Sequence, residues 1–269
     1  MKPGWMCEGF FRTNHVKPID PAHGTVSRLD APANASRAFT LVELLVIIGV
    51  VALLVSIQLP ALAKARRHTD LAQCAANLRQ VTIAFHIYAA ENGDRLPVAT
   101  AGYWAWDMPW NLATVLGTYG APRSALYCPA NPDQNALWDF APNSIRVVGY
   151  ALTLVNGGSI NPTNWNAALT PQTVVTGIAS WPPPLASQRV LVADAVLSAP
   201  GQNNETNRET YNYTSIPGGT PTKMRTSHLD GFLPAGGNLG MLDGHVEWRA
   251  FQQMHVRTPV GSGTPVFWW

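Results

Sequence analysis

An uninterrupted apolar segment, residues 38–63, constrains this 269-residue chain more than any other feature. It reads AFTLVELLVIIGVVALLVSIQLPALA, and its only charged residue is Glu43. A helix of about 20 apolar residues is long enough to cross the hydrocarbon core of a bilayer. A secretory signal has an apolar core of only about 7–15 residues, and a buried core helix with so few polar positions would be unusual in a domain of this size. The segment therefore predicts one membrane-spanning helix.

The composition of the remaining chain indicates a loop-rich domain. Charged residues make up 13% of the chain, against a usual value of about 25%, and there are 22 Gly and 22 Pro. Residues 1–38 contain five Lys or Arg and three Asp or Glu, so the net charge of +2 belongs to this stretch and the rest is neutral. Nucleic-acid binding requires a clustered basic face, so we expect no nucleic-acid partner.

The start of the apolar segment resembles the processing site of type IV pilins and type II secretion pseudopilins. Ala38 is followed by Phe-Thr-Leu-Val and then Glu43, which matches the family's motif of a small residue, Phe, Thr, Leu, a hydrophobic residue and Glu. The family usually has Gly where this chain has Ala38. The resemblance implies that a prepilin peptidase removes residues 1–38 as a leader and methylates the new amino group of Phe39. Glu43 is then the fifth mature residue, and Pro60 occupies a position where pilins commonly carry proline.

Helical periodicity continues beyond the membrane segment, which we place at residues 39–63, through residues 64–92. Apolar residues recur there at spacings of three and four, as one stripe: Leu71, Cys74, Leu78, Val81, Phe85 and Tyr88. The stripe is too short to favour a coiled coil, so we expect it to pack on the chain's own globular domain. Asn92-Gly93 predicts the end of the helix.

Residues 93–269 predict a periplasmic globular domain rich in β-structure. Residues 145–154 and 189–195 are each expected to form a strand. Residues 238–251 predict a hairpin with Asp243-Gly244 as a two-residue turn, and Val246 and Trp248 on its packed face. The predicted fold class is α+β and pilin-like, with a long N-terminal helix packed on a small antiparallel sheet.

The C-terminal region carries a second resemblance, to the H-X9-DG region that follows pilin-type N-termini in many bacterial proteins. The matching residues are His228, Asn238, Asp243, Gly244, His245 and Val246. Here 14 residues separate His228 from Asp243, five more than the motif's name requires, and the insertion is assigned to residues 229–237. Earlier parts of the chain match the same group at Asn77-Leu78-Arg79-Gln80, Cys128-Pro129 and Ala193-Asp194.

The cysteines bear on the redox compartment. Removal of the expected leader takes away Cys7 and leaves Cys74 and Cys128. Disulfides persist in the periplasm, so a Cys74–Cys128 disulfide is one prediction. Two buried free thiols are the alternative, since sequence does not fix the geometry.

Catalytic motifs are missing from the sequence, so we do not expect an enzyme. A metal or acid–base group could be formed by His228, Asp243 and His245, but the predicted turn explains Asp243 more simply. Whether a metal binds is left open. Oxygen ligands of the kind that calcium uses occur at Asp194, Asn203, Asn204 and Glu205. Their spacing matches no known calcium loop, so we expect no cofactor and keep calcium only as an alternative.

Aromatic residues cluster in two places. The first group is Tyr103, Trp104, Trp106 and Trp110, and the second is the chain end, Phe267-Trp268-Trp269. Core packing is the simplest interpretation of the first group, and an exposed platform for sugars or a subunit contact is the alternative. The chain end is expected either to dock into the fold or to contact a partner.

These observations and resemblances lead to a functional expectation. The chain should be a structural subunit of a type II secretion or type IV pilus-like assembly. It should span the bacterial inner membrane once, with its C-terminal domain in the periplasm or, within a filament, outside the cell. The implied partners are prepilin peptidase, other pilin-like subunits and the inner membrane. The alternative is a permanently anchored periplasmic module that binds polysaccharide or protein.

The first prediction concerns processing. In cells with an active prepilin peptidase, the membrane-bound chain should begin at methylated Phe39, because Ala38 and Phe39 flank the expected cut. N-terminal sequencing and intact mass of the purified chain measure this directly. A chain that keeps residues 1–38 under these conditions would contradict it.

Overall fold

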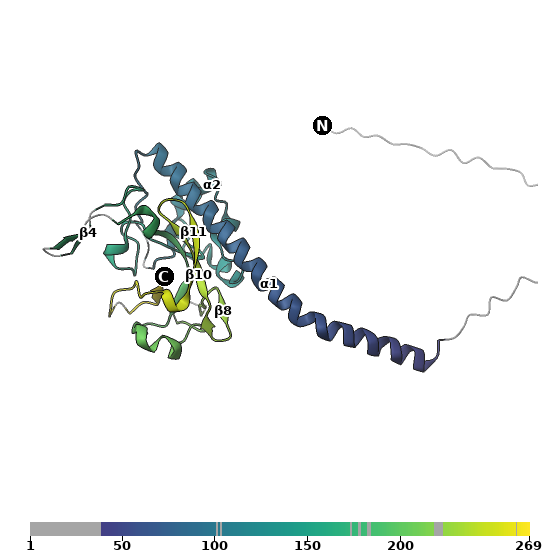
Figure 1. The fold of residues 1–269 in the computed structure, drawn as a ribbon. Helices are drawn as coiled ribbons and strands as arrows, with labels where there is room; N and C mark the ends of the chain where they lie inside the picture. Colours follow the sequence, from purple (N-terminus) through teal and green to yellow (C-terminus); the bar gives the residue numbers. More distant parts are fainter. Residues whose placement is uncertain are drawn as a thin grey trace, which may run out of the picture. The chain divides into compact units, whose positions relative to one another are not determined.

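Helix α1 (Leu41–Glu91) is a single helix of 51 residues that begins and ends within two residues of the predicted bounds. The computed structural model describes residues 39–269 except 101, 103, 173, 177–178, 182–183, 218–222 and 262, so Ala38 and the expected leader lie outside the described residues. The chain divides within α1 into two units, Met1–Ala52 and Leu53–Trp269. Pro60 lies inside the helix, which runs through it without a break (Figure 1).

The N-terminal part of α1 buries none of its apolar surface. Between Leu41 and Leu62 every Leu, Ile and Val side chain is exposed, and Phe39 just before the helix is exposed as well. A mean hydropathy of 2.6 over 18 residues with no burial makes α1 long and apolar enough to cross a membrane. By length and composition, the helix is compatible with the predicted membrane-spanning segment.

The C-terminal part of α1 packs on the globular domain along the predicted stripe. Cys74, Leu78, Val81 and Phe85 are fully buried. The helix residues that the structure buries are Cys74, Asn77, Leu78, Val81, Thr82, Ala84, Phe85 and Ala89. An amphipathic helix of this kind gains its stability by burying one face against the rest of the domain.

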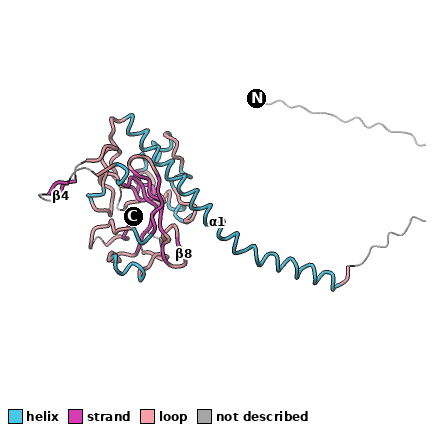
Figure 2. Tube along the Cα trace, in the orientation of Figure 1, coloured by secondary structure: helices cyan, strands magenta, loops and turns pink. Residues whose placement is uncertain are grey.

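A four-stranded antiparallel sheet lies against this face of α1, in the order β11-β10-β6-β3. Its strands are β3 (Tyr150–Leu152), β6 (Val190–Asp194), β10 (Gly236–Met241) and β11 (Val246–Ala250). The register pairs Ala193 with Ala151 on one side and with Leu239 on the other. Figure 2 shows the strands, in magenta, beside the C-terminal part of α1. Both central strands, β6 and β10, are buried along their whole length and, apart from Asp194 and Asn238, consist of small and apolar residues.

Short elements surround this sheet. The paired strands are β1 (Asp107–Pro109) with β2 (Ile145–Val147), β4 (Val174–Thr176) with β5 (Ala179–Trp181), β7 (Val196–Ser198) with β12 (Val266–Trp268), and β8 (Leu229–Asp230) with β9 (Leu233–Pro234). A second α-helix, α2 (Trp110–Thr118), follows β1 directly. The 3-10 helices are η1 (Arg123–Leu126), η2 (Pro132–Leu137), η3 (Pro162–Asn164), η4 (Ala186–Gln188), η5 (Glu205–Thr210) and η6 (Phe251–Gln253). The structure thus confirms the α+β class.

Two sequence predictions of β-structure need correction. The strand expected at 145–154 is two strands, because β2 pairs with β1 whereas β3 pairs with β6. Gly149 lies between them and approaches the Tyr127 backbone so closely that a Cβ atom would be 2.9 Å from its Cα. The hairpin at 238–251 exists, but its loop is longer than two residues, since Gly240 pairs with Val246. Gly244 adopts φ 96° in that loop, a conformation that favours glycine.

The aromatic residues mostly build the core. Trp106 is fully buried, with its ring 5.3 Å from that of Phe267. The whole chain end, residues 267–269, is buried, and its first two residues belong to β12, which confirms that it docks into the fold. Trp110 keeps 43% of its surface exposed, and so does Trp248 at 42%, against the prediction that Trp248 is packed. Tyr103 lies outside the described residues.

The second prediction concerns the contact between α1 and β10. A Cβ atom on Gly240 would lie 2.3 Å from Thr82 Oγ1 and 3.6 Å from Thr82 Cβ. Gly240→Ala should therefore destabilise the domain by about 1–3 kcal/mol through overpacking. Adding Thr82→Ala removes the clashing oxygen, so the double variant should be more stable than Gly240→Ala alone.

Thermal unfolding of the detergent-solubilised chain measures both effects. Gly117→Ala in α2 is the matched control, because a Cβ there meets no atom within 4 Å. It should stay neutral or gain at most about 1 kcal/mol. Equal melting temperatures for the wild type and Gly240→Ala would refute the close packing of β10 on α1.

Candidate functional site

Four buried side chains with metal-binding or acid–base chemistry meet beneath α1: Cys74, Cys128, Asp194 and His228. Their sulfur, oxygen and nitrogen ligand atoms all lie within 4.8 Å of one another. None of the four residues is more than 6% exposed. They come from four separate segments of the chain, namely α1, the loop after η1, the end of β6 and the residue before β8. We call them the Cys–Asp–His cluster.

Asp194 and His228 make the central contacts of the cluster. The thiol of Cys74 donates to Asp194 Oδ1, with the two atoms 2.9 Å apart. His228 Nε2 lies 3.0 Å from Asp194 Oδ2 and 3.3 Å from Cys128 Sγ. The Tyr150 hydroxyl is 3.8 Å from Cys74 Sγ, so the thiol has a second polar neighbour.

Local backbone structure positions these side chains. Pairing of Leu239 with Ala193 sets Asn238 beside Asp194, where its backbone N–H donates to Oδ2 over 2.7 Å and its side-chain amide donates over 3.2 Å. Gly237 gives Asp194 the room it needs, since a Cβ there would lie 2.9 Å from Asp194 Cβ.

Asn77 positions the segment that carries Cys128. Its side-chain amide donates to the Tyr127 carbonyl over 3.0 Å, and Gly149 N–H donates to the Leu126 carbonyl over 2.8 Å. Five of the residues that match the H-X9-DG group at distant places in the sequence therefore converge here, namely Asn77, Cys128, Asp194, His228 and Asn238. Sequence reasoning found them one by one but did not combine them, because nothing in their spacing says that they meet.

The electrostatics of the cluster are strongly coupled. Burial raises the pKa of the Cys74 thiol, and the nearby Cys128 and Asp194 raise it further. Burial alone would also raise the pKa of Cys128, but hydrogen bonds with Cys74 and His228 lower it to about 7. Burial would lower the pKa of His228, but hydrogen bonds with Asp194 and Cys128 raise it to about 10. Contacts within the cluster thus lower the pKa of the Cys128 thiol and raise the pKa of the His228 imidazole.

The geometry differs from that of a thiol nucleophile activated by a His–Asp pair. In such a relay the imidazole contacts the nucleophile with one nitrogen and the carboxylate with the other. Here His228 Nε2 contacts both Cys128 and Asp194. Four buried donor atoms within 4.8 Å of one another are instead a group that could hold a metal ion.

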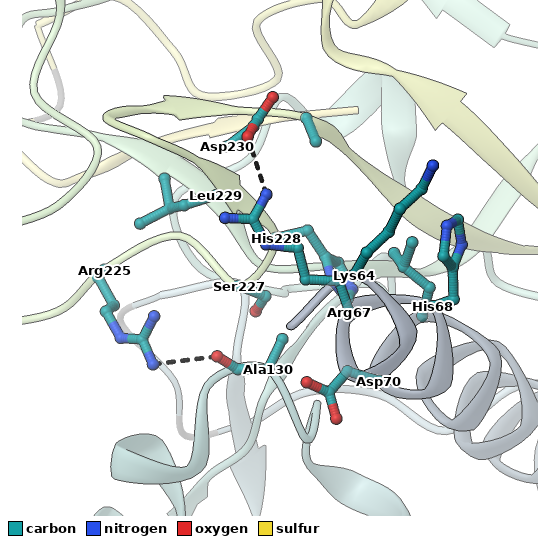
Figure 3. Close-up of a pocket in the computed structure, with 12 residues that line it drawn as sticks. Lys64, Arg67, His68, Asp70, Ala130, Arg225, Ser227, His228, Leu229 and Asp230 are labelled. Carbon is teal, nitrogen blue, oxygen red and sulfur yellow. Dashed lines mark hydrogen bonds and ion pairs between the residues drawn. The ribbon is translucent and has the colours of Figure 1, made fainter. Parts of the chain in front are cut away.

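A cavity of about 430 Å³ borders the cluster at His228 (Figure 3). One wall comes from α1, with Lys64, Arg67 and Asp70, and the other from residues 225–235. Arg67 bridges the two walls through an ion pair with Asp230 at 3.0 Å. His228 is the cluster residue that lines the cavity.

The predicted disulfide is not formed, and the cysteines take the alternative state. Cys74 and Cys128 are both buried free thiols. Their sulfur atoms are close, but Cys74 donates to Asp194 while Cys128 contacts His228.

Other predicted site residues do not join the cluster. Asp243 and His245 contact each other at 2.6 Å in the half-exposed hairpin loop, whereas His228 is buried with Asp194. The candidate calcium ligands have separate partners: Asp194 is bound within the cluster, Asn204 caps η5, and Glu205 accepts from His255 and from Val256 N–H.

Comparison of the chain with protein-family models, curated proteins and solved structures found no match.

The start of α1 holds a feature that the sequence analysis did not identify. Thr40 N–H and Thr40 Oγ1 donate to Glu43 Oε2 over 2.9 and 2.8 Å, and Glu43 N–H donates to Thr40 Oγ1 over 3.2 Å. This reciprocal pair is a capping box, whose signature, Thr or Ser followed three residues later by Glu, is visible in the sequence. Of the processing residues, Glu43 thus lies in the first turn of α1 and Phe39 lies just before the helix.

The third prediction tests the state of the thiols. Iodoacetamide should leave Cys74 and Cys128 unmodified in the native chain, because both are buried. It should modify both after unfolding in denaturant without a reductant. Peptide mass mapping scores each site separately, and a Cys74–Cys128 disulfide peptide would contradict the prediction.

Proposed function

We propose that this chain is a pilin-like structural subunit that is held in the bacterial inner membrane by α1 and then extracted into a filament of a type II secretion or type IV pilus-like assembly. In this proposal a prepilin peptidase cuts before Phe39 and methylates its amino group. The domain formed by the later residues lies in the periplasm. The role is assembly rather than catalysis.

The observation that supports the proposal most is the difference in burial between the two parts of α1. Apolar side chains from Leu41 to Leu62 are all exposed, whereas residues from Cys74 onward are buried on one face. The exposed stretch has no protein partner in the described chain and needs an apolar environment, either lipid or the helices of neighbouring subunits. A filament subunit needs lipid around this stretch before assembly and the helices of neighbouring subunits around it afterwards.

The capping box supports a second element of the proposal. Glu43 places the one carboxylate of the apolar segment at the first turn of α1, three residues from Thr40. A carboxylate in the hydrocarbon region costs about 2.5–3.5 kcal/mol on insertion scales, so it is usually paired and functional. Cleavage before Phe39 would create a cationic amino group beside it. In a filament, Glu43 of an arriving subunit would neutralise this group on its neighbour and set the axial register.

The fourth prediction separates capping from charge pairing. Glu43→Gln keeps a side chain that can accept from Thr40 N–H but removes the charge, so membrane insertion should be retained while filament incorporation falls at least tenfold. Glu43→Ala loses the cap as well, and a lost N-terminal cap interaction costs about 1 kcal/mol. Fractionation measures the amount of each variant in the membrane and the amount in sheared filaments.

Glu91→Gln is the matched control, because Glu91 is the acidic residue at the opposite end of α1 and pairs with the Tyr119 hydroxyl. It should enter filaments normally. Normal incorporation of Glu43→Gln would contradict charge pairing and favour a permanently anchored module that binds polysaccharide or protein.

A further inference from the structure

We infer that Cys74, Cys128, Asp194 and His228 bind one zinc ion as a structural metal centre. The inference rests on the geometry of the cluster and is independent of the proposed role in assembly. Tetrahedral zinc, with bonds of about 2.3 Å to sulfur and about 2.0–2.1 Å to nitrogen, separates its donor atoms by roughly 3.3–3.8 Å. The contacts here of 2.9, 3.0 and 3.3 Å, all within a 4.8 Å group, need only a small expansion around the ion.

The donor set selects the metal. Calcium and magnesium prefer six or more oxygen ligands, whereas this cluster offers two sulfurs, one nitrogen and one carboxylate oxygen. Two thiolates with an imidazole in a tetrahedral arrangement are typical of zinc. A structural zinc site uses four protein ligands and leaves no position for water, which fits the burial of all four residues.

The surroundings supply the second layer of contacts that metal sites use to orient their ligands. Asn238 donates twice to Asp194 Oδ2, so Oδ1 is the oxygen left to face the ion. The Tyr150 hydroxyl near Cys74 Sγ provides a further polar contact to a thiolate. Such contacts fix ligand orientation, and their loss typically lowers metal affinity by about 10–100-fold.

Without a metal, burying the same four groups together costs free energy. Two thiols, a carboxylate and an imidazole would share protons in a dry interior, where unpaired charges are costly. A zinc ion would displace those protons and neutralise most of the negative charge of two thiolates and a carboxylate. It would also join α1, the loop after η1, β6 and the segment before β8 at one point.

Metal content of the full chain tests the inference. The chain is solubilised in detergent, purified with a tag free of histidine and without chelator, and analysed by elemental mass spectrometry. We expect close to one zinc per chain in the wild type and at least a tenfold lower content in Cys128→Ser and His228→Ala. The matched control is the double variant Asp243→Ala, His245→Ala, which removes an exposed Asp–His contact and should keep its zinc.

Cobalt substitution tests the ligands without relying on variants that might fail to fold. The wild-type chain, stripped of metal and reloaded with Co²⁺, should show the intense thiolate-to-cobalt absorption and visible bands of a tetrahedral site. Removal of zinc by a chelator should lower the melting temperature of the wild type, because a ligand that binds the folded state stabilises it. A folded wild-type chain that takes up neither zinc nor cobalt would overturn the inference, as would a Cys74–Cys128 disulfide in the isolated protein.

Discussion

The burial of Asp194 is the constraint on which the rest of the domain depends. A carboxylate that is only 1% exposed must be satisfied by donors, since an unpaired charge in a protein interior is costly. The Cys74 thiol, His228 and the backbone and side chain of Asn238 fill that role. These three residues lie on α1, before β8 and on β10. The contacts of Asp194 therefore help to hold α1 in one rotation against the sheet and β10 in one register beside β6.

The same constraint explains how one helix serves two environments. From Cys74 onward the packing face of α1 is defined by contacts that tolerate little change, including Thr82 against Gly240 and Asn77 against the Tyr127 carbonyl. Before residue 63 every Leu, Ile and Val side chain of the helix is exposed, so no apolar face is buried there. One continuous helix thus has two different parts. Its C-terminal part packs on the domain by one face, and its N-terminal part keeps its apolar side chains exposed.

Much of this architecture could be predicted from the sequence, and the failures have physical causes. The helix, its buried stripe and the β10–β11 hairpin follow from local periodicity and turn chemistry, which act over a few residues. The break at Gly149 depends on its approach to the Tyr127 backbone, and Trp248 is half-exposed because β11 is the edge strand of the sheet. Such features are set by tertiary contacts that no local pattern records. The Cys–Asp–His cluster is the strongest example, because its four members span residues 74 to 228.

The segment after His228 explains how His228 and Asn238 both reach Asp194 although they are not neighbours in the sequence. The segment after His228 forms the β8–β9 hairpin, and Ala235 N–H closes it by donating to the His228 carbonyl over 2.8 Å. The chain thus leaves the cluster at His228 and returns to it at Asn238, so both residues still reach Asp194. The β8–β9 hairpin turns the chain back on itself, and this brings the two residues to the same carboxylate. The exposed Asp243–His245 pair lies outside this closed loop, in the turn between β10 and β11. It is therefore separate from the buried His228 and Asn238.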